Sequence, residues 1–129
     1  MEAQKYARVI YWRARPGQFE AYSEYVLNHV EPIDHEALQR GSLISFTTLV
    51  DSSPGAAWTH MRIFVFANEQ QRTHMVEALG QANAALNPDP AVRAARVAHA
   101  ATLRDKVGES DFDVLGETFR FCRCGLIEG

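Results

Sequence analysis

Residues 58–67 read Trp-Thr-His-Met-Arg-Ile-Phe-Val-Phe-Ala, and this stretch decides the fold. Its aromatic and β-branched content predicts a β-strand from Ala57 to Ala67. Because side chains alternate between the two faces of a strand, the stretch forms two rows. One row is compact, as suits a surface packed under helices: Thr59, Met61, Ile63, Val65 and Ala67. The other row is large and aromatic with two polar groups, as suits a pocket lining: Trp58, His60, Arg62, Phe64 and Phe66.

The same kind of pattern predicts the other elements on either side of this strand. Strands are expected over residues 6–14, 42–50 and 112–122. Helices are expected over about 17–30, 69–86 and 90–107, with a short irregular or helical piece over 34–40. A turn cluster at 51–55 joins the second and third strands as a hairpin.

Several residues predict where the helices begin and end. Pro32 is expected to interrupt the first helix near its end. Asn68 with Gln71 resembles a capping box, and Asp89 is placed as an N-cap with Pro90 at the first helical position. Gly108 is expected to stop the third helix.

The element order defines the fold class. This order predicts a ferredoxin-like α+β sandwich with helices on one face of the sheet: strand, helix, strand, strand, helix, extra helix, strand. The length of 129 residues fits one domain, residues 1–129. Since the second sheet face is also apolar, we expect a second copy of the chain to cover it in a homodimer.

Composition excludes several classes of function. The chain carries 13 basic and 16 acidic side chains, a formal charge of −3, which gives no electrostatic footprint for nucleic acid or an anionic membrane. A hydrophobic content of 47% excludes intrinsic disorder. Without an apolar run of roughly 20 residues or a secretory signal pattern, we expect no membrane span and a cytoplasmic location.

His60 and Arg62 are the candidate catalytic residues. A buried guanidinium needs a partner, and Glu117 in the predicted last strand is a candidate. In a functional site, Arg62 holds a carboxylate or enolate oxygen and His60 acts as general base. The aromatic residues Trp58, Phe64 and Phe66 clamp an apolar ring. In the alternative interpretation, both polar side chains reach the rim and make ordinary interface contacts.

Tyr11 and Trp12 lie on opposite faces of the first strand, so one of them joins the pocket wall in either register. Ordinary packing in the core or the dimer is the alternative for both, because large aromatic side chains dominate all of these settings.

No metal site or cofactor is expected. A cluster of histidines and acids lies at the end of the first helix: His29, Glu31, Asp34, His35 and Glu36. The cluster spans Pro32 and does not present ligands on one helical turn, so its acids are expected to be solvated. Cys122 and Cys124 are interpreted as reduced thiols. The chain lacks a Walker loop, a dinucleotide fingerprint and a G-x-S-x-G elbow, which excludes the corresponding phosphate-cofactor and serine-hydrolase chemistry.

The chain resembles the dimeric α+β barrel superfamily. The junction at 15–20, the helix leading to 29–32, Gly41 and the hairpin are similar to the antibiotic-biosynthesis monooxygenases and their relatives. The later layout, with a helix, a break at 88–90 and another helix after the third strand, is similar to NIPSNAP-like domains. The extra helix and the absence of a helix-borne histidine suited to haem depart from the oxygenase and haem-degrading members.

The resemblance implies a homodimer whose two sheets face each other, with a ligand pocket between each sheet and its helices or in the barrel interior. Members of the superfamily include cofactor-free oxygenases that act on polyphenolic or quinone-like substrates, haem degraders, isomerases and proteins without known activity. The sequence therefore predicts a homodimer that binds a small aromatic or acidic molecule. It acts either as a cofactor-independent monooxygenase or isomerase, or as a non-catalytic binding or interaction protein.

Overall fold

One of the two central strands of the sheet is β1 (Lys5–Ala14), which pairs on both sides in the computed structural model. The structure describes residues 4–117. β3 (His60–Phe66) and β4 (Arg104–Val114) flank β1, and β2 (Ser45–Val50) pairs with β3. The sheet order is β2-β3-β1-β4 with antiparallel pairing throughout. This topology confirms the predicted ferredoxin-like α+β fold.

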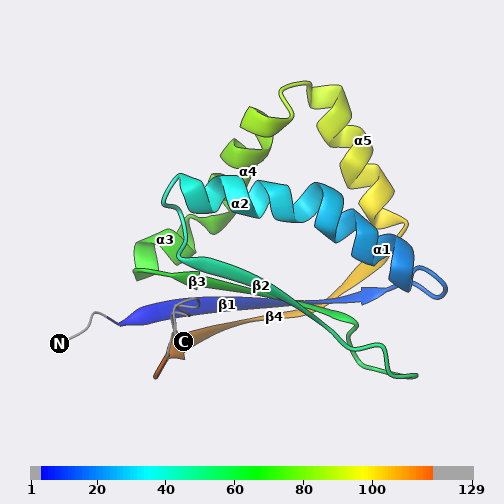
Figure 1. The fold of residues 1–129 in the computed structure, drawn as a ribbon, viewed down its shortest axis with the longest axis horizontal. Helices are drawn as coiled ribbons and strands as arrows, with labels where there is room; N and C mark the ends of the chain where they lie inside the picture. Colours follow the sequence, from blue (N-terminus) through cyan, green and yellow to red (C-terminus); the bar gives the residue numbers. More distant parts are fainter. Residues whose placement is uncertain (1–3, 118–129) are drawn as a thin grey trace, which may run out of the picture.

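All helices of the described residues lie on one face of the sheet (Figure 1). The first connection is a continuous helical run of α1 (Phe19–Tyr25), a π-turn η1 (Val26–Val30) and α2 (Glu31–Gln39). The second connection holds α3 (Glu69–Thr73), α4 (Met75–Leu86) and α5 (Pro90–Ala101). α4 and α5 form an arch over the sheet, and their shared turn is the point farthest from it (Figure 1).

Pro32 does not end the first helical run. The π-turn at Val26–Val30 places Pro32 in the first turn of α2. A proline is tolerated there because the first N–H groups of an α-helix have no partner within that helix. The run therefore continues to Gln39, so the piece predicted over 34–40 is helical. It ends at Gly41, which adopts φ +78° and donates its N–H to the Leu38 carbonyl.

Both predicted helix starts are confirmed. The Asn68 side chain accepts a hydrogen bond from the Gln71 N–H at 2.8 Å. The Gln71 side chain then accepts from the Ala67 N–H, one residue before the position a standard capping box uses. Asp89 accepts from the Ala91 N–H at 2.9 Å, with Pro90 in the first turn.

The predicted boundary between the third helix and the last strand is wrong. α5 ends at Ala101, and Gly108 lies inside β4 opposite Tyr11 rather than at a helix end. The register of β1 and β4 shifts between Tyr11 and Trp12, and a glycine fits such an irregular position. The predicted strand residues 118–122, Cys122 and Cys124 lie outside the described residues.

The prediction for the two faces of β3 is also wrong, because the rows are exchanged. His60, Arg62 and Phe66 are only 1%, 4% and 0% exposed, beneath the chain's own helices. The compact row with Ile63 and Val65 lies on the other face, which no helix of the described residues covers (Figure 1). The polar side chains are tolerated beneath the helices because α1 and α2 supply partners for them.

The uncovered face of the sheet is apolar. Its side chains alternate with the helix-facing ones, and they include Ala7, Val9, Tyr11, Leu49, Met61, Ile63, Val65 and Phe112. Ala7, Val9 and Val65 are buried, whereas Leu49 and Phe112 are each nearly half-exposed. We call this set the open face. Within residues 4–117, no helix has the length and hydropathy needed to span a membrane.

Candidate ligand cavity

A cavity of about 480 Å³ lies between the sheet and the helices. Its floor comes from strands, with Ile10 and Trp12 on β1, Arg62 and Phe64 on β3, and Arg104 on β4. Its walls come from all the long helices. The wall residues are Tyr25, His29, Val30, Ile33, Asp34, Met75, Val76, Leu79, Gly80, Asn83, Arg93, Arg96 and Val97. The cavity therefore lies on the helix-covered face of the sheet.

Arg62 and Asp34 form a buried ion pair in this cavity. Their side chains are 5% and 2% exposed, and the Arg62 Nη2 donates to Asp34 Oδ2. Arg62 Nε is buried and has no hydrogen-bond partner among the described residues. A buried donor without a partner is costly, so this atom marks a place where an acceptor is missing.

Asp34 is the most perturbed carboxyl group of the site. Burial raises its pKa to about 6, although Arg62 acts in the opposite direction. Glu31, one turn earlier on the same helix, adds a smaller upward effect. At neutral pH Asp34 is thus a carboxylate that takes up a proton more readily than an exposed aspartate.

Arg104 is held flat against an aromatic floor. Its guanidinium carbon lies 3.7 Å from the centre of the Trp12 ring, and Nη1 donates to the Tyr22 hydroxyl at 3.1 Å. This hydroxyl has a raised pKa, chiefly because it is buried. Stacking and one neutral hydrogen bond leave the positive charge of Arg104 uncompensated.

Two further arginines project from α5. Arg93 donates to the carbonyls of Asn87 and Pro88, and Arg96 donates to the Asn87 side chain. Both groups lie near the end of α4, where a positive charge is favourable. Within residues 4–117, no carboxylate lies within ion-pair distance of Arg93, Arg96 or Arg104. The cavity therefore combines four arginines with one aspartate.

His60 lies beside the cavity but is not part of its lining. The Ser23 hydroxyl donates to the Phe19 carbonyl, so Ser23 Oγ is left to accept from His60 Nε2 at 2.9 Å. Because a neutral imidazole with its proton on Nε2 has an acceptor at Nδ1, the Thr59 hydroxyl, whose oxygen accepts from the Ala14 N–H, donates to His60 Nδ1 at 2.8 Å. These partners assign the neutral tautomer with the proton on Nε2.

Burial, with a smaller effect of Arg62, lowers the pKa of His60 to about 4 from 6.5. Between these two values the unfolded chain binds a proton at His60 and the folded chain does not. The contribution of His60 to the free energy of unfolding therefore decreases as the pH falls from 6.5 to 4. Asp34 acts in the opposite direction over a similar range, because its pKa is raised.

We predict that the imidazole signals of His60, followed by NMR, titrate near pH 4. As the pH falls across this window, the free energy of unfolding of the wild type is expected to decrease by about 2–3 kcal/mol relative to that of His60→Gln. Asp34 is present in both proteins, so its effect cancels in this comparison. A midpoint near 6.5, the ordinary value for histidine, contradicts the buried network.

The structure brings together three of the predicted site residues and separates the others. Trp12, Arg62 and Phe64 line the cavity, whereas Phe66 belongs to the core under the helices. Trp58 precedes β3 instead of sharing its alternation, and its ring packs 6.2 Å from that of Tyr11, on the open-face side. Phe66, Trp58 and Tyr11 therefore do not line the cavity.

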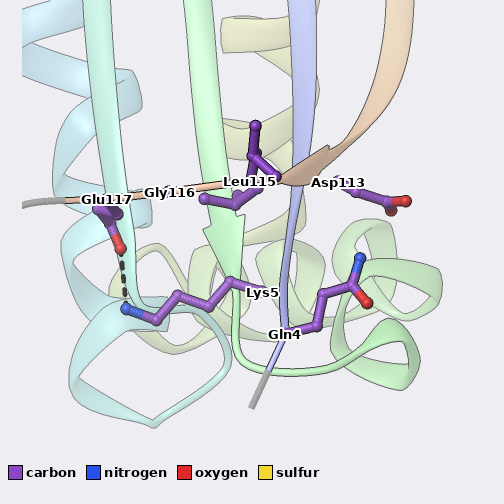
Figure 2. Close-up of a pocket in the computed structure, with 7 residues that line it drawn as sticks. Gln4, Lys5, Asp113, Leu115, Gly116 and Glu117 are labelled. Atoms are coloured by element: carbon purple, nitrogen blue, oxygen red, sulfur yellow. Dashed lines mark hydrogen bonds and ion pairs between the residues drawn. The ribbon is translucent and has the colours of Figure 1, made fainter. Parts of the chain in front are cut away.

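Glu117 is not the partner of Arg62. It lies beyond the end of β4 and forms an ion pair with Lys5 at 2.8 Å (Figure 2). The true partner, Asp34, was placed by sequence in a cluster of solvated acids. The apolar stripe of Val30, Ile33 and Ala37 surrounds Asp34 and puts it on the buried side of α2, which is the signal that could have found it. Nothing local in the sequence marks Arg93, Arg96 or Arg104.

Within the described residues, no three histidine, cysteine or acidic side chains gather closely enough to hold a metal ion. The cavity instead offers guanidinium groups, one carboxyl group and aromatic rings. The fold and this site define a ferredoxin-like protein with an arginine-lined cavity under its helices.

Comparisons with known proteins place the chain in the same fold group. The structure is similar to a dimeric ferredoxin-like protein from an uncultured marine organism, with a TM-score of 0.62, 12% identity and coverage of 89% of this chain and 99% of that one. It is similar to HapK from Hahella chejuensis, with a TM-score of 0.59, 15% identity and coverage of 90% and 98%. A NIPSNAP-like domain protein from Burkholderia xenovorans gives a TM-score of 0.52, 16% identity and coverage of 93% and 90%.

These likenesses confirm the ferredoxin-like fold, and the similar proteins include a dimeric ferredoxin-like protein and a NIPSNAP-like domain protein. Because the identities are low, they concern the fold and not the chemistry. No protein-family model and no curated protein matches the sequence.

Proposed function

We propose that the protein binds a small organic anion with a flat apolar body in the cavity between sheet and helices. The observation that carries this proposal is Arg62, a buried arginine whose Nε lacks a partner in a cavity lined by three more arginines without carboxylate partners. Uncompensated guanidinium groups in a half-open cavity favour a carboxylate or enolate oxygen.

The remaining lining supports an apolar body for the ligand. Phe64, Ile33, Met75 and Leu79 enclose the space between the arginines, and the stacked pair of Arg104 and Trp12 forms a flat floor. Apolar walls with a few convergent polar groups are typical of small-molecule sites. An aromatic or other planar acid fits this combination better than a sugar or a peptide.

Binding can be tested with naphthoate and its neutral counterpart naphthamide. We expect naphthoate to quench Trp12 fluorescence and bind more tightly than naphthamide, because only the acid pairs with the arginines. Arg104→Met is expected to weaken naphthoate binding by about 10–100-fold, the loss of one charge-assisted hydrogen bond or ion pair, and to leave naphthamide nearly unchanged.

Arg15→Met is the matched control, because Arg15 forms an exposed pair with Asp105 outside the cavity. It is expected to bind both compounds as the wild type does. Equal binding of acid and amide by the wild type contradicts the proposal.

We further propose that the functional unit is a homodimer joined through the open face. The row of apolar side chains there, with Phe112 and Leu49 nearly half-exposed, is too extensive for a free surface. A similar protein is titled dimeric, which supports the same arrangement here.

The second candidate function is catalytic. A cofactor-independent monooxygenase or isomerase needs a neutral base. The low pKa of His60 keeps its imidazole neutral at pH 7, and His60 would act from beside the cavity, where Ser23 and Thr59 hold its two ring nitrogens. Oxygen uptake with dihydroxynaphthoate tests the monooxygenase form. Loss of oxygen uptake in His60→Gln with retained naphthoate binding supports catalysis through His60. Oxygen uptake that persists in His60→Gln contradicts catalysis through His60.

A further inference from the structure

The anion site of the proposed function already contains a carboxylate. Asp34 occupies one face of the Arg62 guanidinium, and both side chains line the same cavity. A ligand anion that pairs with Arg62 in this cavity then lies next to the Asp34 carboxylate. Two carboxylates that share one buried site repel each other, and the pair lowers its free energy by holding a proton.

We propose that Asp34 is the specificity-determining residue of this cavity, a built-in carboxylate that accepts one proton when an organic anion binds at Arg62. This inference rests on the proposed function, since it concerns the same cavity. The proton comes from solvent and stays on Asp34 while the anion is bound, and no bond other than the O–H bond forms or breaks.

The charges around Asp34 decide which group takes up the proton. β3 contributes Arg62, β4 contributes Arg104, and α5 contributes Arg93 and Arg96. Each of these groups is a guanidinium, a hydrogen-bond donor without an acceptor atom, so none of them can take up the proton. β1 and α4 line the cavity only with uncharged side chains, at Ile10 and Trp12 and from Met75 to Asn83.

Three other titratable groups lie nearby. Glu31 is on the helix that carries Asp34 and accepts a hydrogen bond from Thr48 of β2. His29 of η1 lies earlier on the same helical run, and its lowered pKa, due to burial and to Arg96 and His99, makes it a poor proton acceptor. Tyr25 has a raised pKa, chiefly from burial, and stays protonated. Asp34 is thus the group best placed to respond to an added anion.

The raised pKa of Asp34, about 6, gives the expected size of the effect. If the anion binds the form with protonated Asp34, that form is about one tenth of the molecules at pH 7 and about nine tenths at pH 5. Naphthoate is therefore expected to bind about tenfold more tightly at pH 5 than at pH 7. A neutral ligand gains nothing from the proton, so naphthamide is expected to show no such change.

Isothermal titration calorimetry of the wild type in two buffers with different ionisation enthalpies measures the proton directly. At pH 7 we expect uptake of nearly one proton per naphthoate bound and none per naphthamide. Asp34→Asn, which keeps the shape of the side chain, is expected to abolish the uptake and to bind naphthoate at pH 7 about as the wild type does at pH 5. His29 also lines the cavity, so His29→Gln serves to identify the proton acceptor: whatever its naphthoate affinity, the proton uptake per naphthoate bound is expected to persist.

Naphthoate binding without proton uptake by the wild type overturns this inference and leaves the proposed function standing. Uptake that disappears in His29→Gln also overturns it, because the proton then belongs to His29. Absence of naphthoate binding overturns both proposals. The wild-type measurement decides the question even where Asp34→Asn does not fold.

Discussion

Asp34→Ala is expected to lower the free energy of unfolding by about 3–5 kcal/mol in urea denaturation at pH 7. Its partner Arg62 is 4% exposed and, without Asp34, keeps a full positive charge beneath α2 with no counter-ion. Removing one partner of a buried pair costs more than the pair itself contributes, because the remaining charge cannot be rehydrated. The loss is a large fraction of the stability of a domain of this size.

Two further variants test the cause of that loss. Glu36→Ala removes an exposed partner of Arg40 on the same helix, and we expect a change within about 0.5 kcal/mol. The double variant Asp34→Leu with Arg62→Met replaces both charges by apolar groups and is expected to recover most of the stability. A decrease of less than about 1 kcal/mol in the free energy of unfolding of Asp34→Ala contradicts the burial of the Arg62–Asp34 pair.

The order of elements could be predicted from the sequence because local chemistry determines it. Asn68 and Asp89 cap helices through contacts with residues two or three positions away, so their roles are visible without the rest of the chain. The start of β4 was not visible. Residues 104–107 follow an alanine-rich helix directly, and only pairing with β1 across the sheet makes them a strand.

The candidate site shows the same limit. Arg62 was correctly singled out as a buried arginine in need of a partner, yet the partner lies 28 positions earlier on a helix. The large aromatic row of β3 suggested a pocket facing a sister molecule, because alternation gives the two faces but not which one the helices cover. Phe64 and Phe66 pack against α2 and α4, so size alone was a misleading guide.

Ile63→Glu is expected to convert the proposed homodimer into a monomer. Ile63 lies in the middle of the open face, between Val9 on β1 and Thr47 on β2. In the dimer, two carboxylates are buried without partners, which costs several kcal/mol and raises the dissociation constant on the order of a thousandfold. Analytical ultracentrifugation is expected to give about twice 14.5 kDa for the wild type and about 14.5 kDa for the variant.

The same substitution separates the dimer from the cavity, because the two lie on opposite faces of the sheet. Every cavity-lining residue comes from one chain, so monomeric Ile63→Glu is expected to keep its naphthoate affinity and its far-ultraviolet circular dichroism. Leu86→Glu is the matched control, since Leu86 is 44% exposed at the end of α4 on the helix side, and it is expected to remain a dimer. A wild type that sediments as a single subunit contradicts the interface, and loss of naphthoate binding in the folded monomer contradicts a cavity that is complete within each subunit.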